Sequence, residues 1–288
     1  MTSHDTTTQP RTFPVSGPLE LAVRLGSGVV EVTAADTAEA TVELTPMRLG
    51  DTDALDVIAQ SRVELRGDSL RIDVPAKHRM MRRTPPVRVR VTVPTDSAVD
   101  AEVGSADVQI EGGIGTLVAE AGSGDLIAGS CGDARIRCGS GDVRISESQA
   151  ITFKSGSGDL TIGWCGGDFT VQSGSGDVSV EQASGKGHIT TASGDVELGD
   201  VGPSTLVKTA SGDVTVRRAS EGELVVKTAS GGVTVGVAAG TVTRLECASV
   251  TGQVHSQLEP GDAPGDAERR LLVNARTVTG GITINRVS

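Results

Sequence analysis

A column of aspartates at near-constant spacing is the feature of this sequence best placed to do chemistry. Successive members lie 17 or 18 residues apart and end Ser-Gly-Asp-like turns; they are Asp107, Asp125, Asp142, Asp159, Asp177, Asp195 and Asp213. Stacked carboxylates predict either a calcium-binding edge or turns in which each carboxylate accepts hydrogen bonds from backbone N–H groups. The Gly-Gly-x-Gly-x-Asp nonapeptide of calcium-binding β-rolls is not matched, which favours the structural turns.

Two further features are candidates for contacting a partner. The first is a basic run that contains Lys77, Arg79, Arg82 and Arg83 and is followed by two prolines. It suits an acidic partner, although the alternative is a solvated loop, and it lacks the interleaved aromatics that stack on bases. The second is Trp164, the only tryptophan, in a glycine-rich turn. We expect both on the surface.

Signs of catalysis are few. The histidines at 4, 78, 188 and 255 are scattered, and the chain has no Gly-x-Ser-x-Gly elbow, His-Glu-x-x-His pair or phosphate-binding loop. A β-helix enzyme that cleaves polysaccharides needs acid and base carboxylates in a groove, and usually aromatic platforms. Nearly all acids here follow the turn period instead. We therefore predict no enzymatic activity and no cofactor.

The four cysteines predict structural free thiols. Cys138 and Cys247 fall in apolar columns, whereas Cys131 and Cys165 fall in looser turns. The latter two are about two coils apart, and a separation of roughly 9–10 Å is too long for a disulfide.

Apolar residues alternate on both sides of every turn, and this pattern predicts the fold. With each aspartate as position zero, positions +1 and +3 and positions −6 and −8 are mostly aliphatic, while position −4 is mostly small. Period-2 alternation is typical of a strand with one buried face. A strand pair of this length cannot bury that face alone, so the repeats must stack. The sequence predicts an all-β solenoid of about ten 17–21-residue coils, with right-handed coiling.

The rhythm divides the chain into three predicted parts. Residues 1–18 form a flexible leader, residues 19–98 form a first coil and a β-rich cap, and residues 99–288 form the solenoid, with a loop insertion at 257–270. A cap is expected because a bare solenoid edge can pair with another chain. Within it we expect strands at 40–44, 62–65, 70–74 and 87–93, a hairpin turn at 66–69, and a short helix at 53–60 capped by Thr52 or Asp51. The strand before Ser288 is expected to leave a free edge.

The net charge of the chain limits the classes of partner that it can bind. A net charge of −11 and a pI near 4.9 disfavour a general nucleic-acid binder and adhesion to an anionic membrane surface. No apolar segment resembles a signal peptide or spans a membrane, so we expect a cytoplasmic protein.

The Ser-Gly-Asp-Val/Leu-x-Val/Ile repeats over roughly residues 99–254 resemble the DUF4097-type family of bacterial β-strand-repeat proteins, which are labelled adhesins. The resemblance implies the repeat fold and supplies no catalytic residues. We predict a binding or scaffold module for a macromolecule, either protein or glycan. The alternatives are a structural protein that self-associates end to end, an exported surface adhesin and, least favoured, a polysaccharide-acting enzyme.

Overall fold

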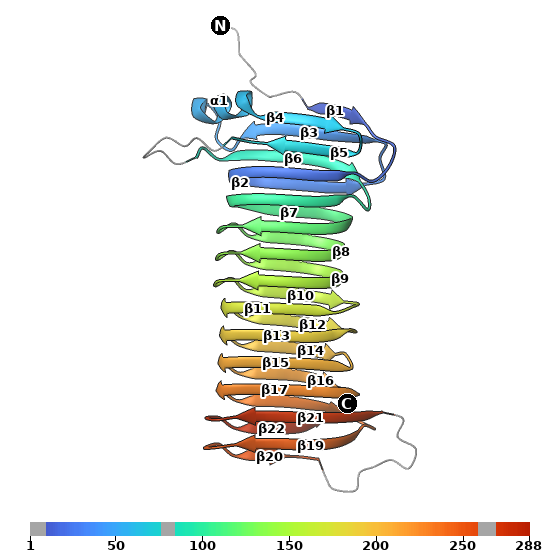
Figure 1. Cartoon of the computed structure of the whole chain (residues 1–288), viewed down its shortest axis with the longest axis vertical. Coiled ribbons are helices and arrows are strands. Elements are labelled where there is room, and N and C mark those ends of the chain that lie inside the picture. Colours follow the sequence, from blue (N-terminus) through green and yellow to red (C-terminus); the bar gives the residue numbers. More distant parts are fainter. Residues whose placement is uncertain (1–9, 76–83, 259–268) are drawn as a thin grey trace. The chain divides into compact units, whose positions relative to one another are not determined.

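The computed structural model describes residues 10–75, 84–258 and 269–288, and it confirms a β-solenoid of parallel strands (Figure 1). The chain forms two compact units, Met1–Val143 and Arg144–Ser288, which are described in turn.

The parallel strands of the second unit lie on two faces, which we call the first and second sheet; the long strand Val143–Ser155 contributes to both, and each later coil contributes one strand to each. In spatial order, the first sheet contains β9 (Val143–Ser155), β11 (Phe169–Ser175), β13 (Lys186–Ser193), β15 (Ser204–Ser211), β17 (Gly222–Ser230), β21 (Arg270–Thr277) and β19 (Val242–Ser249). The second sheet contains β10 (Leu160–Cys165), β12 (Val178–Ala183), β14 (Val196–Val201), β16 (Val214–Ala219), β18 (Val233–Ala238), β22 (Ile282–Val287) and β20 (Val254–Ser256).

The predicted apolar columns form the core of this unit. Val178, Val196 and Val214 lie opposite one another in successive coils and are at most 1% exposed. On the other sheet, the aligned Phe153 and Val171 are fully buried. The core is therefore a stack of aliphatic ladders with two phenylalanines near its start.

The turns explain the residue types that flank each aspartate. The glycine before position zero has a φ of +135° at Gly194 and +141° at Gly212, a region that side chains avoid. A Cβ on Gly212 would also collide with the carbonyl oxygen of Gly194 in the preceding coil. At position −4, the buried Thr209 hydroxyl donates to the carbonyl of Ser211, 3.1 Å away. Glycine thus permits close stacking, and threonine satisfies a turn carbonyl.

The aspartate carboxylates bridge neighbouring coils. Oδ1 of Asp177 accepts a hydrogen bond from the backbone N–H of Asp195 at 2.8 Å, and Oδ1 of Asp195 accepts one from Asp213 at 2.8 Å. Asp159 and Asp213 make the same bond to the next coil, as do Asp107 and Asp125 in the first unit. These aspartates therefore act as the predicted structural turn residues.

The final coils do not stack in chain order. β21 lies between β17 and β19, and β22 lies between β18 and β20. The turn glycines show the same stacking order, because Gly280 lies over the carbonyl of Gly231 and Gly252 lies over the carbonyl of Gly280. The predicted free edge after Ser288 is thus wrong: β22 is inserted between two coils, and the outermost coil is formed by β19 and β20. The long connection after β20 gives the chain the length to return.

The first unit is also built out of chain order. β2 (Glu20–Ala35) pairs on one side with β7 (Ala98–Ala121), which in turn pairs with β8 (Leu126–Cys138). On its other side β2 pairs in parallel with β5 (Ser69–Asp73) and β6 (Val87–Pro94). The chain therefore leaves β2, builds the outer strands, and returns to continue as β7.

Antiparallel strands cover the outer edge of this unit. β4 (Arg62–Arg66) pairs with β5 through the predicted hairpin, and β3 (Glu39–Pro46) pairs with β6. The predicted helix is α1 (Thr52–Gln60), capped by Asp51, whose Oδ1 accepts from the N–H of Ala54 at 3.0 Å. Residues 11–14, expected in the flexible leader, instead form β1 (Arg11–Pro14) because the outer edge of β3 is open to antiparallel pairing.

Three of the four cysteines are buried, and Cys247 is half-buried. Cys131 and Cys165 lie within β8 and β10 rather than in looser turns, and their exposed fractions are 4% and 0%. Among the described residues, no helix has the length and apolar character needed to cross a membrane.

The register predicts the effect of Val178→Asp in the core ladder. Val178 is 1% exposed, so the variant places an unpaired charge among apolar residues and should lose roughly 3–5 kcal/mol of unfolding free energy. Thr234→Asp adds the same charge at an exposed position of β18 and should stay within about 0.5 kcal/mol. Urea unfolding compares the two, and equal stabilities would show that the register is wrong.

The carboxylate bridges predict a graded response at Asp195. Asp195→Ala removes the acceptor for the N–H of Asp213 and should cost about 1 kcal/mol, whereas Asp195→Asn keeps an oxygen acceptor and should cost less. Because the carboxylates already accept backbone hydrogen bonds, the Tm of the unsubstituted protein should be equal in millimolar Ca²⁺ and in EDTA. A higher Tm in Ca²⁺ would instead favour the calcium-binding edge.

Candidate functional site

Of the residues predicted as site candidates, the structure describes the aspartate column and Trp164. The aspartate column lies at turns, and in the part of the chain that the structure describes no group of three or more His, Cys, Asp or Glu could hold a metal ion. Lys77, Arg79, Arg82 and Arg83 lie outside the described residues. Trp164 is half-buried, since a Cβ on Gly166 would meet its ring at 2.5 Å. Its ring lies against Gly166, which reduces the surface available for stacking.

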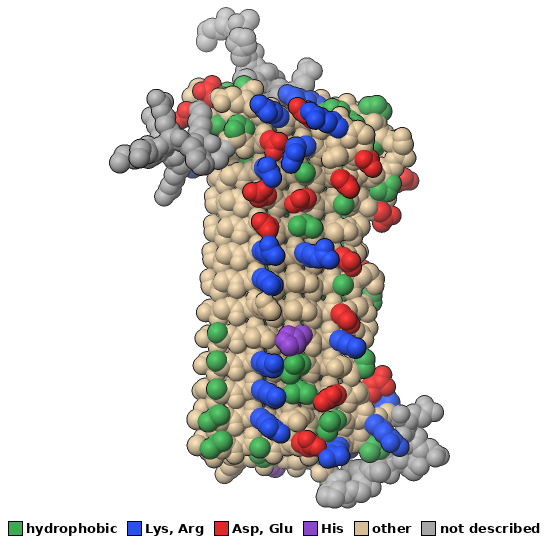
Figure 2. Space-filling view, viewed as in Figure 1, with side chains coloured by type: hydrophobic (Ala, Val, Ile, Leu, Met, Phe, Trp, Pro, Cys, Tyr) green, Lys and Arg blue, Asp and Glu red, His purple; other side chains and the backbone are tan. Residues whose placement is uncertain are grey.

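A different set of residues forms a charged line on the outward face of the first sheet of the second unit. Lys208 of β15 lies opposite Lys227 of β17, which lies opposite Arg276 of β21. All three side chains are exposed. Parallel strands lie about 4.8 Å apart, so three like charges are stacked at that spacing. We call these residues the cation ladder; Figure 2 shows basic side chains in a vertical run there.

Apolar side chains flank the cation ladder on both sides. Two residues earlier in β15 and β17 lie the half-buried Leu206 and Val225, which are aligned with each other. Two residues later come the exposed Ala210 and Ala229, and Val278 follows β21 with 49% of its surface exposed. The alternation of the strands dictates this, because residues two apart point to the same side. The face therefore combines a basic line with apolar margins.

None of the three residues of the cation ladder has an acidic partner among the described residues, and the three are stacked in neighbouring strands. At the same repeat position in the first unit, Arg24 pairs with Glu102 at 2.8 Å and Arg137 pairs with Glu120 at 3.1 Å. Coil-to-coil ion pairing is thus the pattern in that unit.

Glu31 in the first unit shows the same compensation. It pairs with Arg90 at 2.7 Å and with Arg88 at 3.2 Å. The hydrogen bond from Arg90 to Glu31, together with their opposite charges, raises the pKa of Arg90. A stack of unpaired cations in a protein of net charge −11 is therefore a local exception.

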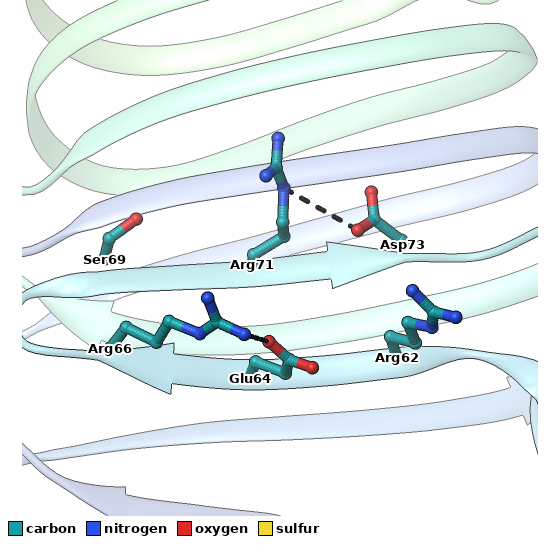
Figure 3. A pocket seen from close by; sticks show the side chains of 6 residues that line it. All are labelled: Arg62, Glu64, Arg66, Ser69, Arg71 and Asp73. Carbon is teal, nitrogen blue, oxygen red and sulfur yellow. Dashed lines mark hydrogen bonds and ion pairs between the residues drawn. The ribbon is translucent and has the colours of Figure 1, made fainter.

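Two hollows offer alternative sites, but their charges are largely balanced. The first lies on the β4–β5 hairpin and has a volume of about 280 Å³ (Figure 3). Within it Arg66 pairs with Glu64 at 2.7 Å, and Arg71 lies 3.6 Å from Asp73. Arg62 is opposite Asp73 in the strand register. The charged groups of this hollow are therefore mostly paired with groups of opposite charge.

The second hollow lies over β10, β12, β14 and β16 and has a volume of about 360 Å³. Gly163 and Gly199 help to create this hollow, because neither has a side chain to fill it. Its Arg217 lies 3.5 Å from Glu197, and its Asp200 lies 3.9 Å from Arg218. In both hollows acidic side chains lie close to the arginines, so the cation ladder, which has no such acids beside it, is the stronger candidate for binding a charged partner.

The sequence contained a signal for the cation ladder. Lys208 and Lys227 occupy position −5 of consecutive repeats, and Arg276 occupies position −5 of the repeat at Gly281. That column of outward residues shows one sign of charge in three repeats. The sequence did not reveal the stacking order. In chain order Ala248 would separate Lys227 from Arg276, whereas in the structure Ala248 lies on the outer side of Arg276.

Comparison with known proteins identifies the fold and its family. Residues 19–288 match the family model described as Toastrack DUF4097. No curated protein matches the chain.

The chain is also similar, at low sequence identity, to several solved structures. One from Bacteroides fragilis, named a "putative adhesin", has 14% identity over 97% of this chain and 96% of its own, with a TM-score of 0.41. A "putative adhesin" from Parabacteroides distasonis has 13% identity over 97% and 96% of the chains and a TM-score of 0.44. A "putative lipid binding protein" from the same species has 12% identity over 98% of each chain and a TM-score of 0.44. The family match spans nearly all of the described repeats, and the chain belongs to the Toastrack DUF4097 family.

Proposed function

We propose that this protein is a non-enzymatic binding module whose partner is an acidic, partly apolar segment of another protein. The observation that supports this proposal is the unpaired cation ladder of Lys208, Lys227 and Arg276. Neighbouring charges at about 5 Å repel by about 1 kcal/mol in water, and an acidic partner would convert that repulsion into attraction.

The surroundings of the cation ladder favour a protein segment over a glycan. Leu206 and Val225 on one side and Val278 on the other offer apolar contact to aliphatic or aromatic side chains. Sugar rings usually stack on exposed aromatic platforms, and Trp164 is half-buried against Gly166. An extended segment that alternates acidic and apolar residues complements both parts of the face.

The adhesin label of the structural neighbours is compatible with a binding role, and it names no partner. The expected lack of enzymatic activity and the expected cytoplasmic location stay predictions from the sequence. Protease accessibility of the tagged protein on intact cells tests the location, since digestion from outside would favour the exported adhesin instead.

The proposal predicts that neutralising the cation ladder weakens binding to a copolymer of glutamate and tyrosine. Each exposed charge contributes about 0.5–1 kcal/mol, so the combined Lys208→Gln, Lys227→Gln and Arg276→Gln variant should bind about 10- to 100-fold more weakly. The affinity of the unsubstituted protein should also fall with added salt, and the variant should lose most of that dependence. Fluorescence anisotropy of the labelled copolymer measures both effects.

A matched control separates the cation ladder from overall charge. The Arg24→Gln, Arg137→Gln and Arg218→Gln variant loses the same charge from residues that already have acidic partners. Its affinity should stay within about twofold of the unsubstituted protein. Equal losses in the two variants would contradict the proposal. Binding of the acidic polysaccharide heparin, without binding of the copolymer, would replace the protein partner by a glycan.

A further inference from the structure

The outermost coil of the second unit leaves part of the apolar ladder uncovered. Val254 of β20 occupies position +1 and is 47% exposed, whereas its neighbour Ile282 in the same column is fully buried. On the first sheet, Leu245 and Cys247 of β19 are half-buried, although the Val273 and Ala275 opposite them are fully buried. The terminal coil thus exposes residue types that every inner coil hides.

The backbone of this coil is open as well. β19 pairs with β21 along one side, and no other described strand pairs with it. In the first unit, by contrast, the outer parallel strands β5 and β6 are covered by the antiparallel β4 and β3. An open edge with apolar side chains is a template for pairing with another strand.

The sequence of β19 complements itself in one antiparallel register. With Leu245 opposite Leu245 of a second copy, Arg244 lies opposite the second copy's Glu246, and the symmetry repeats that pair. Arg244 and Glu246 already pair at 2.9 Å within the strand, so the four charges would alternate in sign. Inward residues also meet inward residues, because Thr243 lies opposite Cys247 of the second copy.

Other registers do not combine these features. Centring the pair on Arg244 or on Glu246 places like charges opposite each other, which is destabilising. A shift by one residue between the strands places inward side chains opposite outward ones. Centring on Cys247 places Glu246 opposite Ala248 and leaves both charges without a cross-strand partner. Leu245 is therefore the favoured centre.

We propose that two copies of this protein form a closed dimer in which β19 pairs antiparallel with β19 of the second copy, about a two-fold axis that passes midway between the two Leu245 residues. Because β20 belongs to the same coil on the second sheet, the same rotation brings the two β20 strands together and covers Val254. The contact is isologous: the same edge of both copies is paired, so no open edge remains at this end and assembly ends at the dimer. This inference does not rest on the cation ladder, and either proposal can fail alone.

Sedimentation equilibrium over a hundredfold concentration range tests the assembly. We expect a reversible monomer–dimer equilibrium with no larger species. A monomer at every concentration would overturn the proposal, and so would a series of growing oligomers, which requires a contact between two different surfaces.

A disulfide tests the register in a Cys247→Ser background. Leu245→Cys places two thiols directly opposite each other, where antiparallel Cα atoms lie about 4.5–5.5 Å apart and a disulfide fits. Arg244→Cys is the matched control, because its thiols would be diagonal neighbours about 7–8 Å apart. On mild oxidation we expect a covalent dimer from Leu245→Cys and little from Arg244→Cys. Equal crosslinking of both variants, or of neither, would overturn the register.

Charge exchange tests the pairing without a crosslink. Arg244→Glu places acids opposite acids and should weaken the dimer at least about tenfold, while adding Glu246→Arg restores opposite charges and should restore association. Circular dichroism melts establish that each variant is folded. Failure of the double exchange to recover the dimer, with both variants folded, would overturn the pairing of Arg244 with Glu246.

Discussion

The close approach of turn backbones in successive coils is the constraint on which this fold depends. At Gly212 the carbonyl of Gly194 occupies the space where a Cβ would lie, so only glycine permits the observed stacking. That proximity brings the carboxylate of Asp195 within reach of the next coil's backbone N–H. The same spacing aligns the valines at position +1 into a ladder without gaps. Close-packed aliphatic side chains then supply the burial that each separate strand pair lacks.

The sequence predicted the inner coils well because every repeat carries the same local information. Turn glycines, aspartates and alternating valines specify both the strand pair and its inward face. The stacking order at the ends carries no such local signal. The edge of β17 accepts Leu271–Arg276 in the same parallel register in which it could accept the next strand in the chain. The long connection before Arg270 gives the chain the length for this exchange.

The candidate site was harder to predict for a related reason. Inward residues must be apolar and must fit the core, whereas outward residues are under no such constraint. The role of an outward residue is therefore visible only when the neighbouring strands are known. Lys208 and Lys227 are ordinary surface lysines when each strand is considered alone. Pairing with Arg276 makes them a line of like charge, whereas the pairing of Arg137 with Glu120 makes a neutral one. Trp164 shows the converse, because its neighbour Gly166 allows the ring to fold onto the backbone.

The symmetry inferred for the β19 edge has a consequence for binding. The two-fold axis between the two Leu245 residues runs perpendicular to the sheet, and rotation about it leaves the outward face of each copy pointing outward. Both cation ladders would therefore face the same side of the dimer. A partner with two acidic segments could bind both ladders, and the second contact would be favoured by the high effective concentration that the first creates. The same strand pairing would then close the exposed edge and strengthen binding at the cation ladder.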